Sequence, residues 1–520
     1  MTNLASTSAG NLGVVTRSDV DEVAGGTIAR HRFHVSRYLA VLAAGFAVGI
    51  ALMHAALLPG GHWTVDEYSD FEYYRRGGLT WLAMRLLTWS PRPVSELMLY
   101  GYWRSVEATG SPLIVPFLGV LWCLLVIGTV LPARPTLTSP GLYRLVIAVC
   151  VLSMFLLGHQ IDDIFYIPWY AAPYLPTLAG LTGAVMTLVF ADAITKRQRW
   201  QCCAWLCLAT ASAETGMFAA LGFGGVLLLL GGMAWLRRGP PEPAAWYLVP
   251  LALALVIMSA ALVTRVTFSP GIVSTDTYSH HFGPSLIAAV RDLPARLAGV
   301  GGVGQDLALA PGLAMRSLLL AGFTLLCRAA MPAPIPLRYA AALLGGLLAT
   351  VLLTSLAAYY QYGFAGFWRH DAFQQCMSIL MFLVIGRLLG SFAVAPRRLS
   401  AGLGSISLIL AMAVGMTWRL PALINDYRAL PATHIAAART LASGKNPLSD
   451  TMQFFLPPDQ RVLQTHMSPG HYEEPPVPGA EVSIMASAVL RYFGKTAVDV
   501  IPWSAEPAAA ETPVRQQVRP

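Results

Sequence analysis

Two adjacent carboxylates, Asp66 and Glu67, follow the first long apolar stretch of the chain. They belong to the segment HWTVDEYSDFEYYRRGG at residues 62–78, which also carries tyrosines and arginines. Charged groups close to hydrocarbon are costly, so carboxylates at a membrane boundary indicate a functional site. Partial desolvation there can raise a carboxyl pKa, which makes the group a better general base. We predict that Asp66 takes a proton from a hydroxyl group, aided by Glu67; the alternative is that they cap a helix that begins here.

Three further carboxylates follow later apolar segments. Asp162 and Asp163 lie in HQIDDIFYIPWY, and Glu214 lies in ASAETGMF. We predict that the aspartate pair orients an acceptor or helps to hold a divalent metal ion, because hard cations bind paired carboxylates. A divalent metal is the one cofactor that these residues suggest, with Asp66 and Asp163 as its expected ligands. The alternative for the aspartate pair is that it lies in a solvated loop and caps the next helix. Glu214 either lies in a tight turn that reaches water, or it is a partner for the site or for an arginine.

Cationic groups begin a later apolar run at Arg369 and His370. A guanidinium fork matches the oxygens of a phosphate, and an imidazole can add a second donor. We therefore predict that Arg369 and His370 bind a phosphate, with Arg265 in support. The alternative is that they anchor the chain in the lipid headgroups. Weaker candidates for the phosphate are Arg75, Arg76 and Arg92.

Other residue types that could do chemistry receive structural explanations. The cysteines at 202, 203 and 207 lack a second pair of metal ligands and indicate helix packing. The histidines at 280 and 281 are expected in an exposed loop, with a metal site there as the alternative, and those at 434, 466 and 471 lack ligand spacing. Aromatic residues that could stack on sugars, but that also fit a belt at the membrane interface, are Tyr68, Tyr73, Tyr74, Trp81, Trp89 and Trp103.

The composition predicts the elements that must position these residues. Of 520 residues only 12% are charged and 55% are hydrophobic, whereas a soluble domain has about 25% charged residues. Because only helices or closed barrels satisfy the backbone in lipid, and the apolar runs are too long for barrel strands, we predict an all-α polytopic membrane protein. A span needs about 20 apolar residues, which gives about eleven spans. Their approximate positions are 38–58, 112–131, 142–158, 170–194, 200–236 (two spans), 245–264, 312–326, 339–358, 373–389 and 401–418.

The basic residues between these runs predict the topology. Lysine and arginine are enriched in cytoplasmic loops, which leaves the N-terminus in the cytoplasm of a plasma (inner) membrane protein. All the candidate carboxylates, together with Arg265, Arg369 and His370, then fall on the external side. We also predict interfacial helices at 68–88 and 284–300. The expected organisation is a disordered cytoplasmic tail at 1–36, a membrane domain at 37–419, a small extracytoplasmic segment at 420–503 and a disordered tail at 504–520.

These segments resemble the GT-C superfamily of polyprenyl-phosphate-sugar-dependent glycosyltransferases, which includes protein mannosyltransferases and the aminoarabinose transferase of lipid A. VDEYSDFEYY is similar to the DE-x-x-Y pattern of their first external loop, and HQIDDIFY occupies the place of a second acidic group. WSPRPVSELML and ASAETG resemble segments of bacterial members. The resemblance covers the membrane region and implies a GT-C fold, a polyprenyl-phosphate-linked sugar donor, inverting transfer to a glycan, lipid or protein acceptor, and an external active site.

Two other functions are consistent with the same pattern. A transporter or flippase for lipid-linked glycans would move its substrate without bond chemistry, and we would expect its charges near the middle of the membrane. A ligase that joins a glycan to a lipid would be expected to keep its essential arginine and histidine in a large late loop. The chain contains no GxGxxG, Walker A or HExxH motif, and its basic residues flank apolar runs, so nucleic acid is not an expected partner.

Overall fold

The computed structural model describes most of the chain between residues 17 and 501. The described residues are 17–89, 91–134, 136, 138–158, 160–238, 245–268, 281–298, 309–331, 333–364, 366, 368–394, 396–455, 458, 460–463 and 489–501. The predicted tail at 504–520 lies outside them. Residues 1–16 do as well, whereas residues 17–36, which the sequence places in a disordered tail, are helical and continue into the first span.

Nine helices within the described residues are long and apolar enough to cross a membrane. The protein is therefore an all-α, multi-pass membrane protein, as its composition predicts. The helices that contain these spans are α1 (Arg17–Ala55), α5 (Ile114–Val130), α6 (Ser139–Leu156), α8 (Pro168–Val189), α10 (Glu214–Arg238), α13 (Leu309–Ala330), α14 (Leu337–Tyr362), α15 (Trp368–Phe392) and α16 (Arg397–Lys445).

Two further helices occupy the remaining predicted span positions. Helix α9 (Lys196–Ser212) has 17 residues and begins with basic side chains. Helix α11 (Ala245–Phe268) contains a shorter apolar stretch, Trp246–Ala261. Neither is counted among the nine, so the predicted total of eleven spans stays a prediction.

Short helices cover one end of the bundle. The loop after the first span forms α2 (Val65–Gly77), α3 (Leu79–Met84), the π-helical turn η2 (Arg85–Trp89) and α4 (Pro93–Thr109). The helix predicted at 68–88 is therefore interrupted, because Gly78 adopts a positive φ of 54°, a conformation that favours glycine. A helix near 284–300 is present as α12 (Phe282–Ala298). The other short elements are the 3-10 turns η1 (Leu58–Gly60) and η3 (Leu131–Ala133), and α7 (Asp162–Tyr166).

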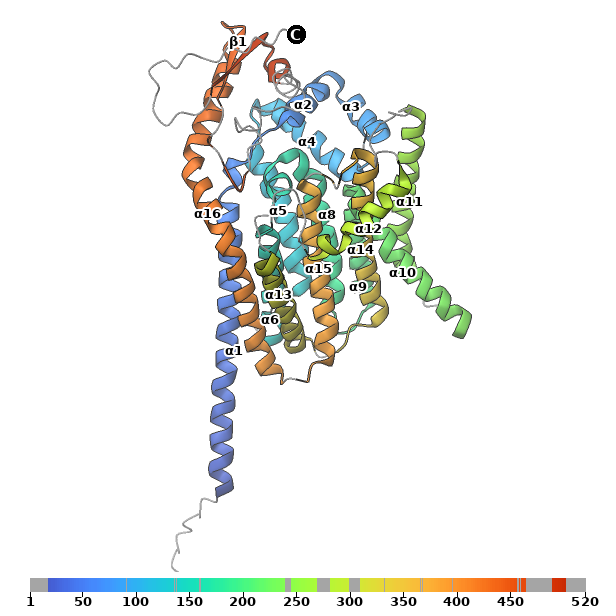
Figure 1. Ribbon diagram of the computed structural model, residues 1–520, viewed down its shortest axis with the longest axis vertical. Helices are drawn as coiled ribbons and strands as arrows, with labels where there is room; N and C mark the ends of the chain where they lie inside the picture. The colour runs from blue at the N-terminus through green and yellow to red at the C-terminus, as the bar shows by residue number, and fades with distance from the viewer. Residues whose placement is uncertain are drawn as a thin grey trace, which may run out of the picture.

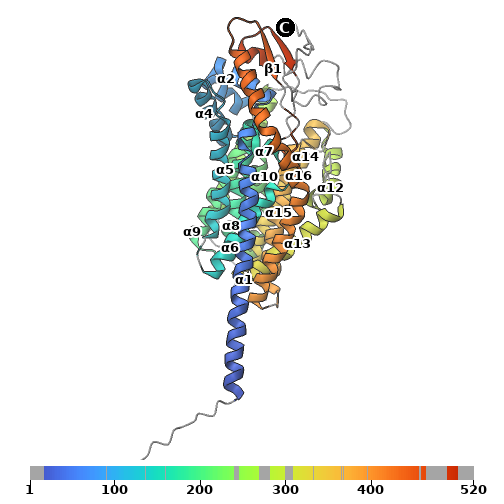
Figure 2. The ribbon, with the colours of Figure 1, turned by 90° about the vertical axis from the view of Figure 1, so that its left-hand side faces the viewer.

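The short helices of the first loop and the C-terminal strands lie at the same end of the bundle. Helices α2, α3 and α4 lie at the upper end in Figure 1, together with strand β1 (Thr451–Phe455). The N-terminal end of α1 and the start of α16 lie at the opposite end, where α1 extends beyond the other helices (Figure 2). Thus the first loop and the C-terminal segment share one face of the molecule.

Helix α16 joins the bundle to the C-terminal segment without a break. It runs for 49 residues and contains Pro421 and Pro431, so the predicted boundary at 419/420 falls inside one continuous helix. Strand β1 pairs in parallel with β2 (Ala497–Ile501) beyond its end. The fully buried Asp426 carboxylate accepts backbone N–H bonds from residues 461, 462 and 463 at 2.7, 2.8 and 2.8 Å. These bonds fasten the segment to α16.

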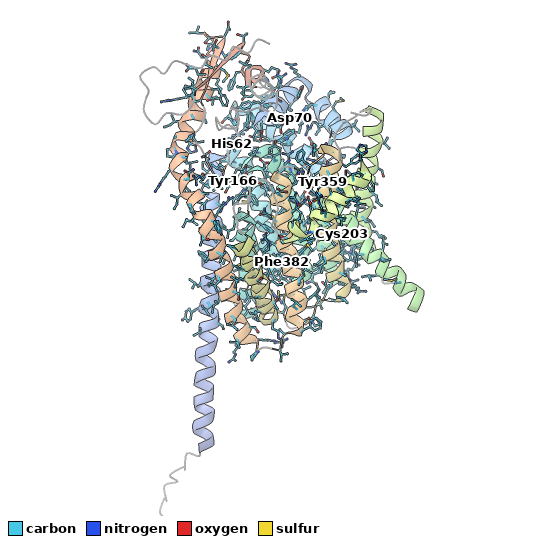
Figure 3. The ribbon with its side chains drawn as sticks, viewed as in Figure 1. His62, Asp70, Tyr166, Cys203, Tyr359 and Phe382 are labelled. Carbon is cyan, nitrogen blue, oxygen red and sulfur yellow. The ribbon has the colours of Figure 1, made fainter. Side chains whose placement is uncertain are left out.

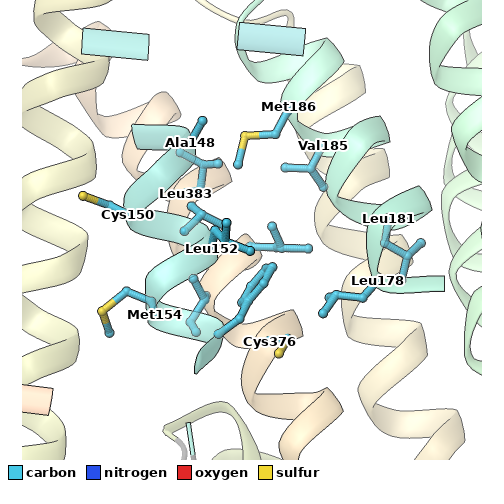
Figure 4. Packing of buried hydrophobic residues seen from close by; sticks show 14 of the residues in the cluster. Ala148, Cys150, Leu152, Met154, Leu178, Leu181, Val185, Met186, Cys376 and Leu383 are labelled. Carbon is cyan, nitrogen blue, oxygen red and sulfur yellow. The ribbon is translucent and has the colours of Figure 1, made fainter. Parts of the chain in front are cut away.

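The core of the bundle is built around α8, which is buried along its whole span. Side chains of α6, α8 and α15 meet there (Figure 4). Small residues let neighbouring backbones approach closely in such bundles: a Cβ on Gly180 would lie 2.5 Å from the backbone oxygen of Trp205 in α9. Cys202 and Cys203 are buried in α9, and no group of three or more potential metal ligands occurs within the described residues. This tight packing holds α8 in the centre of the bundle, and the candidate site lies at the first turn of this helix.

Candidate functional site

The first turn of α2 and the first turn of α8 meet at the predicted base. The Tyr170 hydroxyl donates a hydrogen bond to Asp66 Oδ2 over 2.6 Å. Asp66 is exposed, whereas Tyr170 is half-buried. The carboxylate predicted to take a proton is therefore accessible and is held by a side chain more than a hundred residues away in sequence.

Tyr170 also contacts the predicted phosphate-binding arginine. The Cζ atom of Arg369, in the first turn of α15, lies 4.5 Å from the centroid of the Tyr170 ring. Arg369 Nη1 lies 4.0 Å from Asp163 Oδ2. The structure thus brings Asp66, Asp163 and Arg369 together around one tyrosine, although they come from three different helices.

The aspartate pair of α7 is enclosed. Asp162 is 0% exposed and Asp163 is 3% exposed. The alternative of a solvated loop is therefore wrong for this pair. Asp163 faces Arg369 and forms an ion pair with it. This contact allows Asp163 to orient the guanidinium of Arg369.

Glu67 has a different environment from its neighbour. It is completely buried, and its carboxylate accepts hydrogen bonds from the backbone N–H and the hydroxyl of Thr64 and, over 3.0 Å, from the backbone N–H of Trp169. Burial raises the pKa of Glu67 to about 7, because these hydrogen bonds only partly offset the loss of water. The capping alternative thus describes Glu67: it holds the start of α2 against the start of α8, whereas Asp66 points to the surface.

A buried charge network that we did not predict supports the same region. Arg85 donates to both oxygens of Glu96 over 3.0 and 3.1 Å, and its Nη1 lies 3.7 Å from Asp70 Oδ1. Burial raises the pKa of Asp70 to about 7. The guanidinium of Arg85 also lies 4.5 Å from the Trp169 ring centroid. Two residues of the first loop therefore contact Trp169, the residue before Tyr170: Glu67 binds its backbone N–H, and Arg85 packs on its ring.

Asp70 belongs to the aromatic cluster that closes this end. Its carboxylate accepts indole N–H bonds from Trp103 at 2.9 Å and Trp81 at 3.3 Å. Asp70 belongs to α2, and Figure 3 shows it well away from Cys203 and Phe382, which lie deeper in the bundle. Trp81 and Trp103 are thus buried structural residues rather than members of an exposed belt.

Glu214 and Arg92 join the loop to the bundle. Arg92 Nε donates to Glu214 Oε2 over 2.6 Å. Beside it, the Ser95 hydroxyl donates to the Ser212 carbonyl over 2.9 Å. Glu214 is therefore the partner of an arginine, one of its two expected roles, and Arg92 is engaged in holding α4 on the turn between α9 and α10.

Arg369 is followed by His370 and Asp371, which face different neighbours. The His370 ring lies edge-on to Tyr174, with 6.3 Å between centroids. Asp371 forms a buried ion pair with Arg296 of α12, each side chain being 6% exposed. Tyr359 also donates to Asp292 of that helix. These contacts dock α12 beside the start of α15.

The remaining candidates lie elsewhere. Arg75 and Arg76 are exposed and pair with Glu72 of their own helix, α2. Arg265 lies in α11, but its side chain is outside the described residues, as are that of Trp89 and residues 280, 466 and 471. His281 is exposed, and His434 contacts the Pro59 carbonyl at 3.0 Å.

A pocket of about 280 Å³ lies between the first loop and the C-terminal segment. Its walls include Trp63 and Tyr68 from the loop and Phe454 and Tyr492 from the C-terminal segment. Asp66 and Arg369 do not line it. The site around Tyr170 is therefore separate from this pocket.

No protein-family model matches the chain, and no curated protein is significantly similar to it. Similarity thus assigns no family. The resemblance of the short motifs to the GT-C superfamily remains a hypothesis, and the geometry around Tyr170 is what bears on function.

Proposed function

We propose that this protein is a membrane glycosyltransferase that moves a sugar from a polyprenyl-phosphate-linked donor to a hydroxyl group of a cell-envelope glycan, lipid or protein. The observation that carries the proposal is the convergence of Asp66, Tyr170, Arg369 and Asp163 at one end of the bundle. An accessible carboxylate and an oriented guanidinium are the two groups that transfer from a sugar phosphate needs.

The proposed reaction assigns one role to each group. The acceptor oxygen attacks the anomeric carbon from the face opposite the phosphate, and its proton passes to the Asp66 carboxylate. The bond between the anomeric carbon and the phosphate oxygen breaks, and its electron pair leaves with the polyprenyl phosphate. Arg369 stabilises the charge on that phosphate, while Asp163 orients Arg369. The sugar is transferred with inversion. No step in this scheme requires a metal, although Asp66 and Asp163 remain the residues that would contact one.

The arrangement of the helices supports an external site at the membrane surface. The start of α16 carries Arg397 and Arg398 and lies at the end opposite α2 (Figure 1), which agrees with basic residues on the cytoplasmic side. Helix α12 buries Ala288 and Ala289 but leaves Ile287 70% exposed, as an interfacial helix would. We therefore place α2 to α4 and α12 at the external surface of the inner membrane, α9 and α11 as the tenth and eleventh spans, and the C-terminal segment outside.

A reconstituted assay tests the proposal. The purified full-length chain in lipid nanodiscs is incubated with a panel of polyprenyl-phosphate-linked sugars and a cell-envelope glycolipid extract, and release of polyprenyl monophosphate is measured. We expect Asp66→Asn to slow turnover by about 10²- to 10⁴-fold and Arg369→Met by about 10²- to 10³-fold. Asp192→Asn, which changes an exposed carboxylate beyond the other end of α8, serves as the matched control.

Turnover that survives Asp66→Asn would remove the base from the scheme. A chain that moves the lipid-linked sugar across the bilayer without releasing polyprenyl monophosphate would instead be a transporter.

A further inference from the structure

Within the part of the chain that the structure describes, Tyr170 contacts both predicted reaction groups. Its hydroxyl bonds Asp66, and its ring lies under Arg369. We infer that Tyr170 is a positioning residue whose hydroxyl orients the base and whose ring orients the phosphate-binding arginine. This inference rests on the proposed function.

The backbone that carries Tyr170 is fixed on its N-terminal side. Pro168 occupies the first turn of α8, where a proline is pre-organised for helix. The next residue, Trp169, gives its backbone N–H to buried Glu67, and its ring lies under the guanidinium of Arg85. A tyrosine on so constrained a segment can orient two mobile side chains. Little further conformational entropy is lost in ordering the tyrosine itself, because its backbone is already fixed.

The hydroxyl and the ring act on different partners. The hydrogen bond occupies Oδ2 of Asp66 and restricts rotation of the carboxylate, which directs the other oxygen, Oδ1, to an incoming hydroxyl group. A ring face attracts a guanidinium through its quadrupole without using an N–H group, so Arg369 can still donate to phosphate oxygens. The two functions can therefore be separated by substitution.

Two substitutions divide the roles. Tyr170→Phe keeps the ring but removes the hydroxyl, whereas Tyr170→Leu removes both. For Tyr170→Phe we expect binding of polyprenyl monophosphate within about twofold of wild type, an unchanged donor KM, and kcat lower by about 10²-fold because the base is misaligned. For Tyr170→Leu we expect the same loss of kcat and, in addition, phosphate binding weaker by roughly 3- to 30-fold.

The experiment measures binding and turnover on the same full-length proteins in nanodiscs. Polyprenyl monophosphate is the binding probe, since it is the common product of every such donor. Tyr143→Phe is the matched control, because this buried tyrosine contacts Ser36 through its hydroxyl and lies at the start of α6. Thermal unfolding of each variant shows whether it is folded, and Tyr170→Phe carries the test even if Tyr170→Leu does not fold.

The outcomes separate this inference from the function on which it rests. Wild-type kinetics for Tyr170→Phe, or equal losses of binding and turnover in both variants, would overturn the positioning role while Asp66→Asn still abolishes turnover. Failure of the wild-type chain to bind polyprenyl monophosphate would overturn both proposals.

Discussion

Asp66 and Glu67 are adjacent in sequence but should respond to substitution in opposite ways. Glu67 is buried and accepts bonds from two backbone N–H groups and one hydroxyl. Asp66 is exposed and accepts one bond, from Tyr170. Truncation of each side chain therefore separates a contribution to stability from a contribution to chemistry.

The magnitudes follow from these contacts. Glu67→Ala leaves the N–H groups of Thr64 and Trp169 without this acceptor in a partly buried setting, and it removes the capping interaction of α2. We expect a loss of about 2–3 kcal/mol in the free energy of unfolding. Asp66→Ala removes one exposed bond and should cost less than about 1 kcal/mol, although turnover falls by about 10²- to 10⁴-fold.

Thermal unfolding in nanodiscs and release of polyprenyl monophosphate are measured on both variants. Glu67→Gln is the control, because an amide oxygen can still accept a bond from the Trp169 N–H. A Glu67→Ala protein as stable as wild type would contradict the anchoring role. An Asp66→Ala protein as unstable as Glu67→Ala would show that loss of turnover reports unfolding rather than loss of a base.

Two further predictions concern buried charge. The pKa of Glu67 is raised from 4.5 to about 7 by burial, so the folded state binds the proton more tightly. Its contribution to stability is therefore complete below about pH 4.5 and is lost by about pH 7, a change of about 3 kcal/mol in the free energy of unfolding. When this free energy is measured across the same pH range, it should vary less with pH for Glu67→Gln than for wild type. Parallel pH dependences for the two proteins would refute the assignment. Arg296→Met alone should destabilise the protein by about 3–5 kcal/mol, because it leaves the buried Asp371 carboxylate without its ion-pair partner. The double variant Arg296→Met with Asp371→Leu should be nearly as stable as wild type. Equal losses of stability in the single and double variants would contradict this.

Hydrophobicity predicted the class of fold, because only helices or closed barrels satisfy the backbone in lipid. The basic residues predicted that Asp66 and Arg369 lie on the same side of the membrane, and the structure brings both to Tyr170. Tyr170 could not be found in this way. Its contacts depend on how α2, α8 and α15 pack, and that is decided by residues far apart in sequence. The burial of Asp162 and Asp163 depends on the same packing.

The different roles of Asp66 and Glu67 had a signal that we did not use. Thr64 and Glu67 have the spacing of a capping box, in which the glutamate turns back to the helix start. This spacing identifies Glu67 as a structural residue and leaves Asp66 for the surface. The interruption at Gly78 also had a signal in the sequence, since Gly77 ends α2 and a second glycine, Gly78, follows it directly.

The continuity of α16 limits how this protein can be divided. A cut at residue 419 would sever a helix midway along its length, separate the Asp426 clamp from the bundle and remove one wall of the 280 Å³ pocket. The C-terminal segment is therefore not a separable domain: we expect that neither half of such a division would keep its native surface. Exchanging this segment with another protein would require the whole of α16 to be exchanged with it.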